Sequence, residues 1–306
     1  MNIHNTRVKK FLYKYRFFQK YRGMNRLKLG LPNYGNTCYI NSVLQCLRYS
    51  KPLVFMLRDH RVNTKNNDKK QQLLESFVEL LYADADPKDL QLFIRNLSIC
   101  CSQFRLLRQC DAHELYLYII DTFFEMFPVT KFPKINNPFK GILESTVTCN
   151  VCGNDSVSSH PFISLSLEMD NSLDKQSVTS MLSNYQSYED LKDPIDCDSC
   201  RCRQPSKKIL SIKECPTLIV LHLKRFHGMN KINTALHIEK KITVNNNPYK
   251  LTCLCNHSGT MYGGHYTSTC LRKDETWVVC NDNHINNIQD LPISTSVPYI
   301  LFYEAI

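Results

Sequence analysis

Apolar residues recur at helical spacing through residues 31–135, and positions i, i+3, i+4 and i+7 of such a repeat predict amphipathic helices. Three segments show this repeat. The first begins near Cys38, with apolar residues at Ile40, Val43, Leu44 and Leu47, and the others are residues 71–82 and 111–124. Residues 88–107 are predicted to be helical or irregular, and the polar segment 63–70 is predicted to be a loop. The first part of the chain is therefore expected to be mainly helical.

From about Pro138 the pattern changes to short segments rich in β-branched, aromatic and alternating apolar residues, with turn residues between them. These predicted strands are residues 162–168, 217–226, 249–255, 264–271, 276–280 and 297–303. The polar residues 170–196 are predicted to form a loop or insertion. A helical part followed by a β part indicates the α+β class.

The net charge of +10 is concentrated in the first 29 residues, which hold nine basic residues and no acidic one. The remainder is nearly neutral. Aromatic side chains are interleaved with the basic ones, and Phe11, Tyr15 and Phe18 could share one helical face. Three interpretations stay open: nuclear targeting or nucleic-acid contact, an interfacial membrane helix, and a solvated extension.

The chain has fifteen cysteines, an odd number, and two pairs are spaced CxxC. No apolar run reaches the ~18 residues of a membrane span, and the N-terminus lacks a secretory signal. A reducing compartment, cytoplasmic or nuclear, is therefore expected, with thiols and metal rather than disulfides. Cys149, Cys152, Cys197 and Cys200 form two knuckles and predict a structural four-cysteine zinc site, with Cys202 as an alternative ligand and a redox pair as the rival. Cys253 and Cys255 are expected to pack in the core.

Cys38 is a candidate nucleophile because of its position at a predicted helix start. Gly35 permits a tight turn and Thr37 is a natural N-cap residue. The peptide dipoles of a helix favour negative charge at its N-terminus, which lowers the pKa of a thiol there. A lone cysteine in this position is more often a packing residue, so the role of Cys38 depends on the other motifs of the chain.

A second constellation lies between His257 and Asp282. Gly263 and Gly264 permit close backbone approach just before His265, and Asn281 follows a predicted strand. A cysteine nucleophile needs a base, and the base needs an orienting partner. Cys38, His265 and Asn281 have these three chemistries.

Several ordered motifs of the chain resemble the ubiquitin-specific proteases, a papain-like family of cysteine deubiquitinases. They are residues 30–45 around Cys38, residues 109–114, residues 216–226, residues 249–266 with His265, and Trp277 followed by Asn281-Asp282. The resemblance covers roughly residues 30–303. It implies a helical thumb at about 30–135, a β palm at about 136–306, and zinc-bearing β fingers inserted at about 144–212, all in one catalytic domain, 30–306, after the extension 1–29.

The resemblance also implies roles for individual residues. Cys38 would be the nucleophile, His265 the base and Asn281 its orienting partner; Asn33 would donate to the oxyanion, and Asp282 would support the imidazole or the oxyanion site. Asp111 and Glu114, a capping-box-like pair by spacing alone, would bind arginines of the ubiquitin tail, while Phe226 and Tyr266 would line a narrow channel or else pack in the core. The chain departs from the family pattern at Cys110, where glutamine is usual, and at Val278, where an aromatic residue is common.

The expected reaction is hydrolysis after the C-terminal glycine of ubiquitin through a thioester, without a catalytic cofactor. A compact, monomeric domain acting on ubiquitin and ubiquitinated proteins is expected, and a viral or pathogen source is a guess. A catalytically silent ubiquitin-binding module and a protease for another ubiquitin-like modifier remain alternatives. Cys38 and His265 are allowed to lie apart until a substrate binds.

Overall fold

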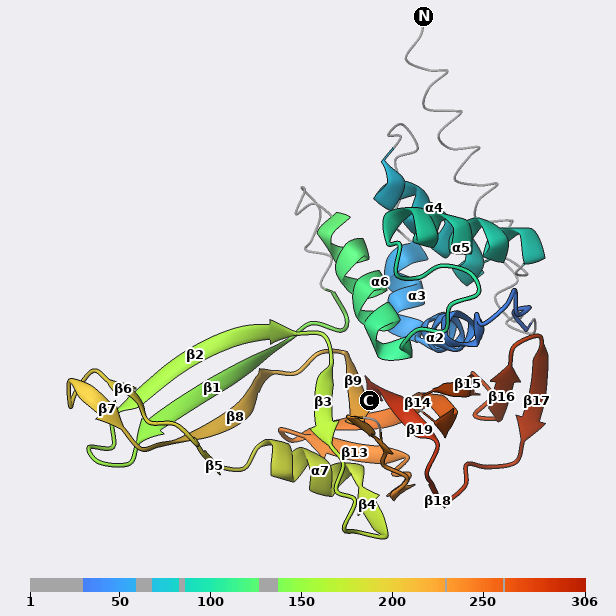
Figure 1. Ribbon diagram of the computed structural model, residues 1–306. Helices are drawn as coiled ribbons and strands as arrows, with labels where there is room; N and C mark the ends of the chain where they lie inside the picture. The colour runs from blue at the N-terminus through green and yellow to red at the C-terminus, as the bar shows by residue number, and fades with distance from the viewer. Residues whose placement is uncertain (1–29, 59–67, 83–85, 127–136, 229, 261) are drawn as a thin grey trace, which may run out of the picture.

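The computed structural model describes residues 30–58, 68–82, 86–126, 137–228, 230–260 and 262–306. Within them, the helices of the first part of the chain gather on one side of the molecule, and the strands lie on the other together with one further short helix (Figure 1). The helices of the first part are α2 (Cys38–Tyr49), α3 (Lys51–Arg58), α4 (Lys69–Tyr82), α5 (Pro87–Cys100) and α6 (Ala112–Met126). The predicted helices are confirmed, whereas the basic extension, residues 1–29, lies outside the described residues.

Residues 88–107 are partly helical and partly irregular, as predicted. Helix α5 begins with Pro87 at its first position, and the Asp86 side chain accepts a hydrogen bond from the backbone N–H of Lys88. This capping residue and the proline both favour a helix start. After Cys100 the chain continues through turns to α6.

An eight-stranded sheet forms the palm of the molecule, with the order β17-β16-β15-β14-β19-β9-β3 and β13 paired to β14. Its strands are β3 (Leu165–Glu168), β9 (Leu218–Lys224), β13 (Lys241–Val244), β14 (Asn247–Thr260), β15 (Gly263–Leu271), β16 (Trp277–Asn281), β17 (His284–Ile288) and β19 (Pro298–Ala305). All six predicted strands contribute residues to this sheet. The α+β class is confirmed.

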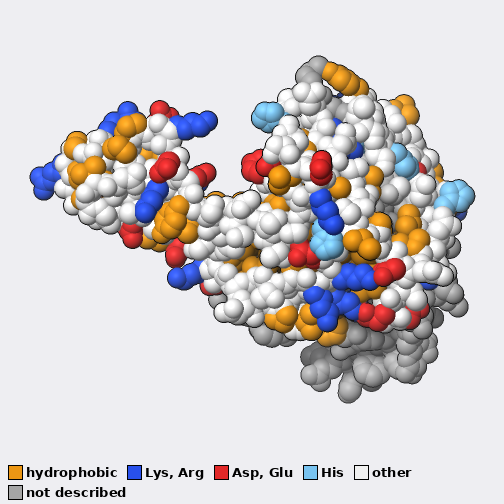
Figure 2. Space-filling view, turned by 90° about the horizontal axis from the view of Figure 1, so that it is seen from below, with side chains coloured by type: hydrophobic (Ala, Val, Ile, Leu, Met, Phe, Trp, Pro, Cys, Tyr) orange, Lys and Arg blue, Asp and Glu red, His pale blue; other side chains and the backbone are white. Residues whose placement is uncertain are grey.

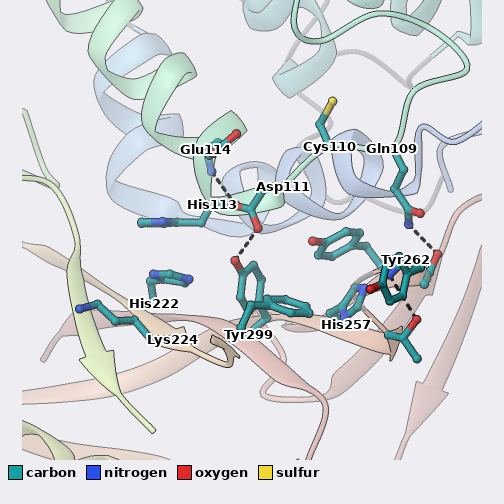
Figure 3. A pocket seen from close by; sticks show the side chains of 14 residues that line it. Gln109, Cys110, Asp111, His113, Glu114, His222, Lys224, His257, Tyr262 and Tyr299 are labelled. Carbon is teal, nitrogen blue, oxygen red and sulfur yellow. Dashed lines mark hydrogen bonds between the residues drawn. The ribbon is translucent and has the colours of Figure 1, made fainter. Parts of the chain in front are cut away.

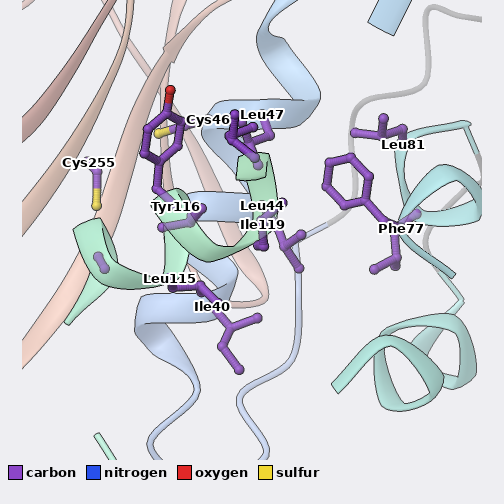
Figure 4. Packing of buried hydrophobic residues seen from close by; sticks show 14 of the residues in the cluster. Ile40, Leu44, Cys46, Leu47, Phe77, Leu81, Leu115, Tyr116, Ile119 and Cys255 are labelled. Atoms are coloured by element: carbon purple, nitrogen blue, oxygen red, sulfur yellow. The ribbon is translucent and has the colours of Figure 1, made fainter. Parts of the chain in front are cut away.

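Helix α2 lies between the other helices and the sheet, and every one of its residues is buried. It contacts β14, β15 and β16 on one side and α3, α4 and α6 on the other. Figure 4 shows Ile40, Leu44 and Leu47 of this helix among side chains of α4 and α6. Because α2 is enclosed by apolar neighbours, its position relative to the sheet is fixed by packing.

A second sheet, of order β2-β1-β8-β5, projects away from the body (Figure 1). Its strands are β1 (Gly141–Cys149), β2 (Asp155–Phe162), β5 (Glu189–Asp190) and β8 (Ser206–Glu214), and the short pair β6 (Ile195–Cys197) and β7 (Cys202–Gln204) lies at its far end. The strand prediction did not find this sheet except for the end of β2. Strand β2 is exposed at seven of its eight positions, so it carries no alternation of apolar and polar residues.

The prediction of a loop or insertion at 170–196 is partly wrong, because it contains strand β4 (Lys175–Ser177) and helix α7 (Val178–Tyr185). Ser177 and Ser180 form a reciprocal capping box at the helix start, and Val178, Met181 and Leu182 are buried. The remaining strands are β10 (Phe226–His227), β11 (Asn230–Lys231), β12 (Ala235–His237) and β18 (Ser294–Thr295). Among the described residues, no helix combines the length and apolar character that crossing a membrane requires.

Candidate active site

Cys38 is the first residue of α2, at the point where the loop 30–37 enters the helix. Its side chain is 3 % exposed. Thr37 occupies the N-cap position but its side chain does not cap the helix. The Thr37 hydroxyl instead accepts a hydrogen bond from the Tyr34 N–H (3.0 Å) and donates one to Asn33 Oδ1 (3.2 Å), so it orders the loop rather than the helix.

Burial raises the pKa of the Cys38 thiol above its ordinary value. The backbone N–H groups of Tyr266 and Tyr39 act in the opposite direction, while the negative charge of Asp282 acts with burial. The prediction of a lowered pKa is therefore wrong for this state, because burial outweighs the helix terminus. The thiol needs a base to remove its proton.

His265 on β15 and Asn281 at the end of β16 form a direct pair, with 2.6 Å between His265 Nε2 and Asn281 Oδ1. This contact leaves His265 Nδ1 as the ring nitrogen available to a nucleophile. In the described part of the chain, the Cys38 thiol and the His265 ring share no hydrogen bond. The structure thus brings base and orienting residue together and leaves the nucleophile apart from them.

Asp282 connects the turn after β16 to the loop that precedes Cys38. Its carboxylate accepts hydrogen bonds from Asn33 Nδ2 (3.0 Å) and from Asn41 Nδ2 (2.8 Å), and its backbone oxygen accepts one from the Leu31 N–H (2.8 Å). Of the two roles expected for Asp282, the geometry favours support of the oxyanion site, since its carboxylate holds Asn33 rather than the His265 ring.

The side-chain oxygen of Asn33 is also fixed. Asn33 Oδ1 accepts hydrogen bonds from the backbone N–H groups of Gly35 (3.0 Å) and Thr37 (3.1 Å). Both polar atoms of the Asn33 amide are therefore held by hydrogen bonds, and one of the two Nδ2 hydrogens is donated to Asp282. An amide nitrogen carries two hydrogens, so a second one remains for a ligand.

We predict that Asp282→Ala lowers the rate of thiol-dependent catalysis at Cys38 by about 10-fold to 10²-fold through kcat, with little change in KM. The substitution frees Asn33 and Asn41, and small losses of orientation cost this much when a catalytic group must be placed accurately. Steady-state kinetics on a fluorogenic ubiquitin amide, the substrate class expected from the sequence, measures the effect, with Asp274→Ala, an exposed carboxylate in the turn before β16, as control. An Asp282→Ala enzyme with unchanged kcat would contradict this role.

A pocket of about 500 Å³ opens between α6 and the sheet (Figure 3). It brings together all four residues predicted to meet the ubiquitin tail. The lining side chains include Asp111, Glu114, Phe226 and Tyr266, together with His113, His222, Lys224, His257, Tyr262 and Tyr299. The grouping predicted from separate stretches of sequence is thus present in one cavity.

Asp111 caps α6, as its spacing predicted. Asp111 Oδ1 accepts hydrogen bonds from the N–H groups of His113 (2.7 Å) and Glu114 (2.9 Å), while Asp111 Oδ2 accepts one from the Tyr299 hydroxyl (2.5 Å). Glu114 does not complete a capping box, because Glu114 Oε2 accepts from Gln103 Nε2 (2.5 Å). Both carboxylate oxygens of Asp111 thus accept hydrogen bonds, whereas Glu114 is exposed and accepts one from a single side-chain amide.

Aromatic rings form the wall of the pocket opposite α6. Phe226 and Tyr299 lie 5.7 Å apart between ring centroids, and His257 and Tyr266 lie 4.6 Å apart. Tyr266 is buried and Phe226 is half-buried. Gln109 Nε2 donates to the Gly264 carbonyl (2.6 Å), which ties the loop before α6 to the strand that carries the catalytic histidine candidate.

The four CxxC cysteines converge at the tip of the projecting sheet. The sulfur atoms of Cys149, Cys152, Cys197 and Cys200 all lie within 4.8 Å of one another. Each knuckle closes with the same turn: the Gly153 N–H donates to the Cys149 carbonyl and the Arg201 N–H to the Cys197 carbonyl. Cys202 lies on β7 outside the group, where it accepts from Gln204 Nε2 (3.0 Å). The group can therefore hold a metal ion without Cys202.

A sequence profile described as ubiquitin carboxyl-terminal hydrolase matches residues 29–303. The chain belongs to this family. Among curated members, the hydrolase 25 of Arabidopsis thaliana is 30% identical over 90% of the chain, and Usp2 of Drosophila melanogaster is 27% identical over 90%. The chain spans 47% and 34%, respectively, of the length of these two hydrolases.

Solved structures with a similar fold agree with this assignment. A SAGA DUB module that contains a substituted Ubp8 and is bound to monoubiquitin matches with a TM-score of 0.80 and 26% identity, over 91% of this chain and 69% of that one. The Ubp8 module bound to ubiquitin aldehyde matches with a TM-score of 0.79 and 25% identity, over the same shares of the two chains. The papain-like thumb, palm and fingers architecture is therefore the fold of this chain.

Asn41 and Tyr299 are site residues of this hydrolase chain that were not predicted from its sequence. Asn41 is 2 % exposed, and its amide also donates to the carbonyls of Leu31 and Pro32. Its place one turn after Cys38 was visible in the sequence, but its partner, Asp282, is far away along the chain. Tyr299 lies in an apolar strand where nothing distinguishes it from a core residue.

We predict that the hydrolase loses stability as pH falls below about 6.5. Burial lowers the pKa of His113 and His257 to about 4 and that of His222 to about 3. The unfolded chain then binds more protons than the folded one, so stability falls as the pH drops toward these values, by up to roughly 3 kcal/mol per ring. Urea unfolding from pH 7 to 4.5 measures this, and His222→Gln should flatten the dependence more than His284→Gln, which changes an exposed ring. Equal slopes for both variants would contradict the assignment.

Proposed function

We propose that this chain is a thiol-dependent deubiquitinase that hydrolyses the isopeptide or peptide bond after the C-terminal glycine of ubiquitin. The observation that carries the proposal is the joined geometry of the two catalytic segments. His265 and Asn281 are paired, and Asp282 ties their strand to Asn33 in the loop before Cys38. The nucleophile, base, orienting residue and oxyanion donor are thus held on one framework.

The reaction begins with transfer of the Cys38 proton to His265 Nδ1. Because burial raises the pKa of Cys38, this transfer requires the two side chains to meet when the substrate binds. The thiolate then attacks the carbonyl carbon of the terminal glycine, and Asn33 Nδ2 and the Cys38 N–H stabilise the oxyanion. His265 protonates the leaving amine, and water hydrolyses the thioester with His265 as base.

The pocket beneath α6 supports recognition of an extended, basic tail. Glu114 is exposed, and an arginine of the tail would replace Gln103 as its hydrogen-bond donor. The Asp111 oxygen that accepts from the Tyr299 hydroxyl would accept from a second arginine. Charge-assisted pairs of this kind are stronger than neutral hydrogen bonds. Phe226 and Tyr266 flank the path toward Cys38, where large side chains would be excluded.

The fingers form a separate lobe joined to the body by a narrow neck, and an open concavity lies between them (Figure 2). We propose that globular ubiquitin occupies this concavity and that a zinc ion holds the fingertip together. Four thiolates satisfy a tetrahedral zinc ion and leave no open position, so the metal would be structural.

We predict that Cys149→Ser lowers the zinc content by one equivalent and weakens ubiquitin binding more than the chemical step. Loss of one thiolate breaks a four-ligand site whose binding energy contributes to local folding. Elemental analysis measures the zinc content. Comparison of the change in KM with the change in kcat separates weaker ubiquitin binding from a slower chemical step. The matched control is Cys202→Ser, which changes an exposed cysteine of the same fingertip outside the cluster; equal zinc loss in both variants would contradict the ligand set.

Turnover of matched substrates tests the proposed activity. Fluorogenic amides of ubiquitin, SUMO and an interferon-induced modifier are compared with the wild-type chain. The proposal predicts hydrolysis of the ubiquitin substrate well above the others. Binding of ubiquitin without turnover would identify a silent binding module, and preference for another substrate would identify a different modifier protease.

A further inference from the structure

A second group of thiols lies in the core, between the catalytic helix and the sheet. The sulfur atoms of Cys46, Cys253 and Cys270 all lie within 4.8 Å of one another. Three elements supply them: α2, β14 and β15. All three residues are fully buried. Figure 4 shows Cys46 of α2 among the buried side chains of this region.

The convergence follows from the pairing of the strands. Cys253 and Cys270 are directly opposite in the β14–β15 ladder, so their side chains share the face that α2 covers. Cys46 meets them from the helix, and the Cys253 thiol lies 3.6 Å from the Cys46 carbonyl. Three thiolates at about 2.3 Å from one ion lie roughly 4 Å apart, which the observed separation fits.

We propose that Cys46, Cys253 and Cys270 form a second, buried zinc site of this chain. The ion would replace the three thiol protons, which are released on binding. Three thiolates and one divalent ion carry a net charge of −1, and buried Arg48 lies on the same helix within electrostatic range of the neighbouring Cys280. Cys280, which interacts with Cys270, lies outside the group of mutually close sulfur atoms and would have to move toward the ion to serve as a fourth ligand.

Such a site would join the helix of Cys38 to the strand of His265. Cys46 lies two turns after Cys38 on α2, and Cys270 lies five residues after His265 on β15. An ion here would therefore fix the distance between the elements that carry the nucleophile and the base. Because the thiols are buried, the ion must enter during folding, so the metal has to be present during synthesis or refolding.

Zinc content per chain tests the proposal on the intact 306-residue chain made in zinc-supplemented medium. Two equivalents are expected for the wild type and for Cys255→Ala, and one each for Cys253→Ala and Cys149→Ser. Cys255 is the matched control, since it is buried on the same strand but its thiol contacts Ser42 rather than the cluster. Loss of zinc only in Cys149→Ser would overturn the proposal.

Because a cysteine variant can fail to fold, a second measurement uses the wild-type chain. Wild type refolded with ¹¹³Cd²⁺ should give two cadmium resonances, and a single resonance would overturn the proposal. Alkylation of the metal-free, denatured chain should find all fifteen thiols. Finding thirteen would instead indicate a disulfide and would also overturn it. Neither readout depends on hydrolysis, so failure here leaves the proposed activity untouched.

Discussion

Replacing His265 by alanine is expected to lower kcat/KM for a ubiquitin amide by about 10²–10⁴-fold. The Cys38 thiol is buried and its pKa is raised, so without the imidazole little thiolate forms at neutral pH. The loss should fall on kcat, because His265 is not part of the pocket that holds the tail. Ubiquitin should still bind the variant with near wild-type affinity.

Stopped-flow hydrolysis and a binding titration on the same preparation separate the two effects. His284→Ala is the control, since this histidine is exposed on β17, the strand paired with that of Asn281. A variant that retains more than a tenth of wild-type turnover would show that another group serves as the base.

Replacing Asn33 by alanine is expected to lower kcat by about 10²–10³-fold, the usual cost of removing one oxyanion donor. KM should change little, because the donated hydrogen bond strengthens only as the tetrahedral intermediate forms. Single-turnover kinetics measures the acylation step directly. Normal acylation in Asn33→Ala would mean that backbone N–H groups alone stabilise the oxyanion.

The double variant Asn33→Ala, Asp282→Ala shows whether Asp282 acts through Asn33. The two residues are hydrogen-bonded, so their effects should be strongly non-additive, and the double variant should be about as slow as Asn33→Ala alone. Fully additive losses would assign Asp282 a separate role.

Elements of the core could be predicted from sequence because burial requires apolar residues, either at helical spacing or in short runs. Helix α2 shows apolar residues at helical spacing, strands β14 and β19 show short apolar runs that are buried on both faces, and their predicted positions are confirmed. The projecting sheet could not be found in this way. Its strand β2 is exposed on both faces and is specified by backbone pairing with β1, which no local pattern records.

The residues of the candidate active site also differ in how far the sequence predicts them. Cys38, His265 and Asn281 were identifiable from their chemistry and order, and the structure joins the last two directly. The pKa of Cys38 was predicted in the wrong direction, because a helix start is visible in sequence while the depth of burial is not. The partners of Glu114 and Asp282 likewise depend on contacts between distant segments.

Covalent capture of ubiquitin tests the central claim most directly. The wild-type chain is incubated with ubiquitin that carries a C-terminal electrophile, and the product is digested and mapped by mass spectrometry. A single adduct on the Cys38 sulfur, absent in Cys38→Ala and present in the matched variant Cys110→Ala, is predicted. Absence of an adduct, or an adduct on any of the other fourteen cysteines in place of Cys38, would contradict the account.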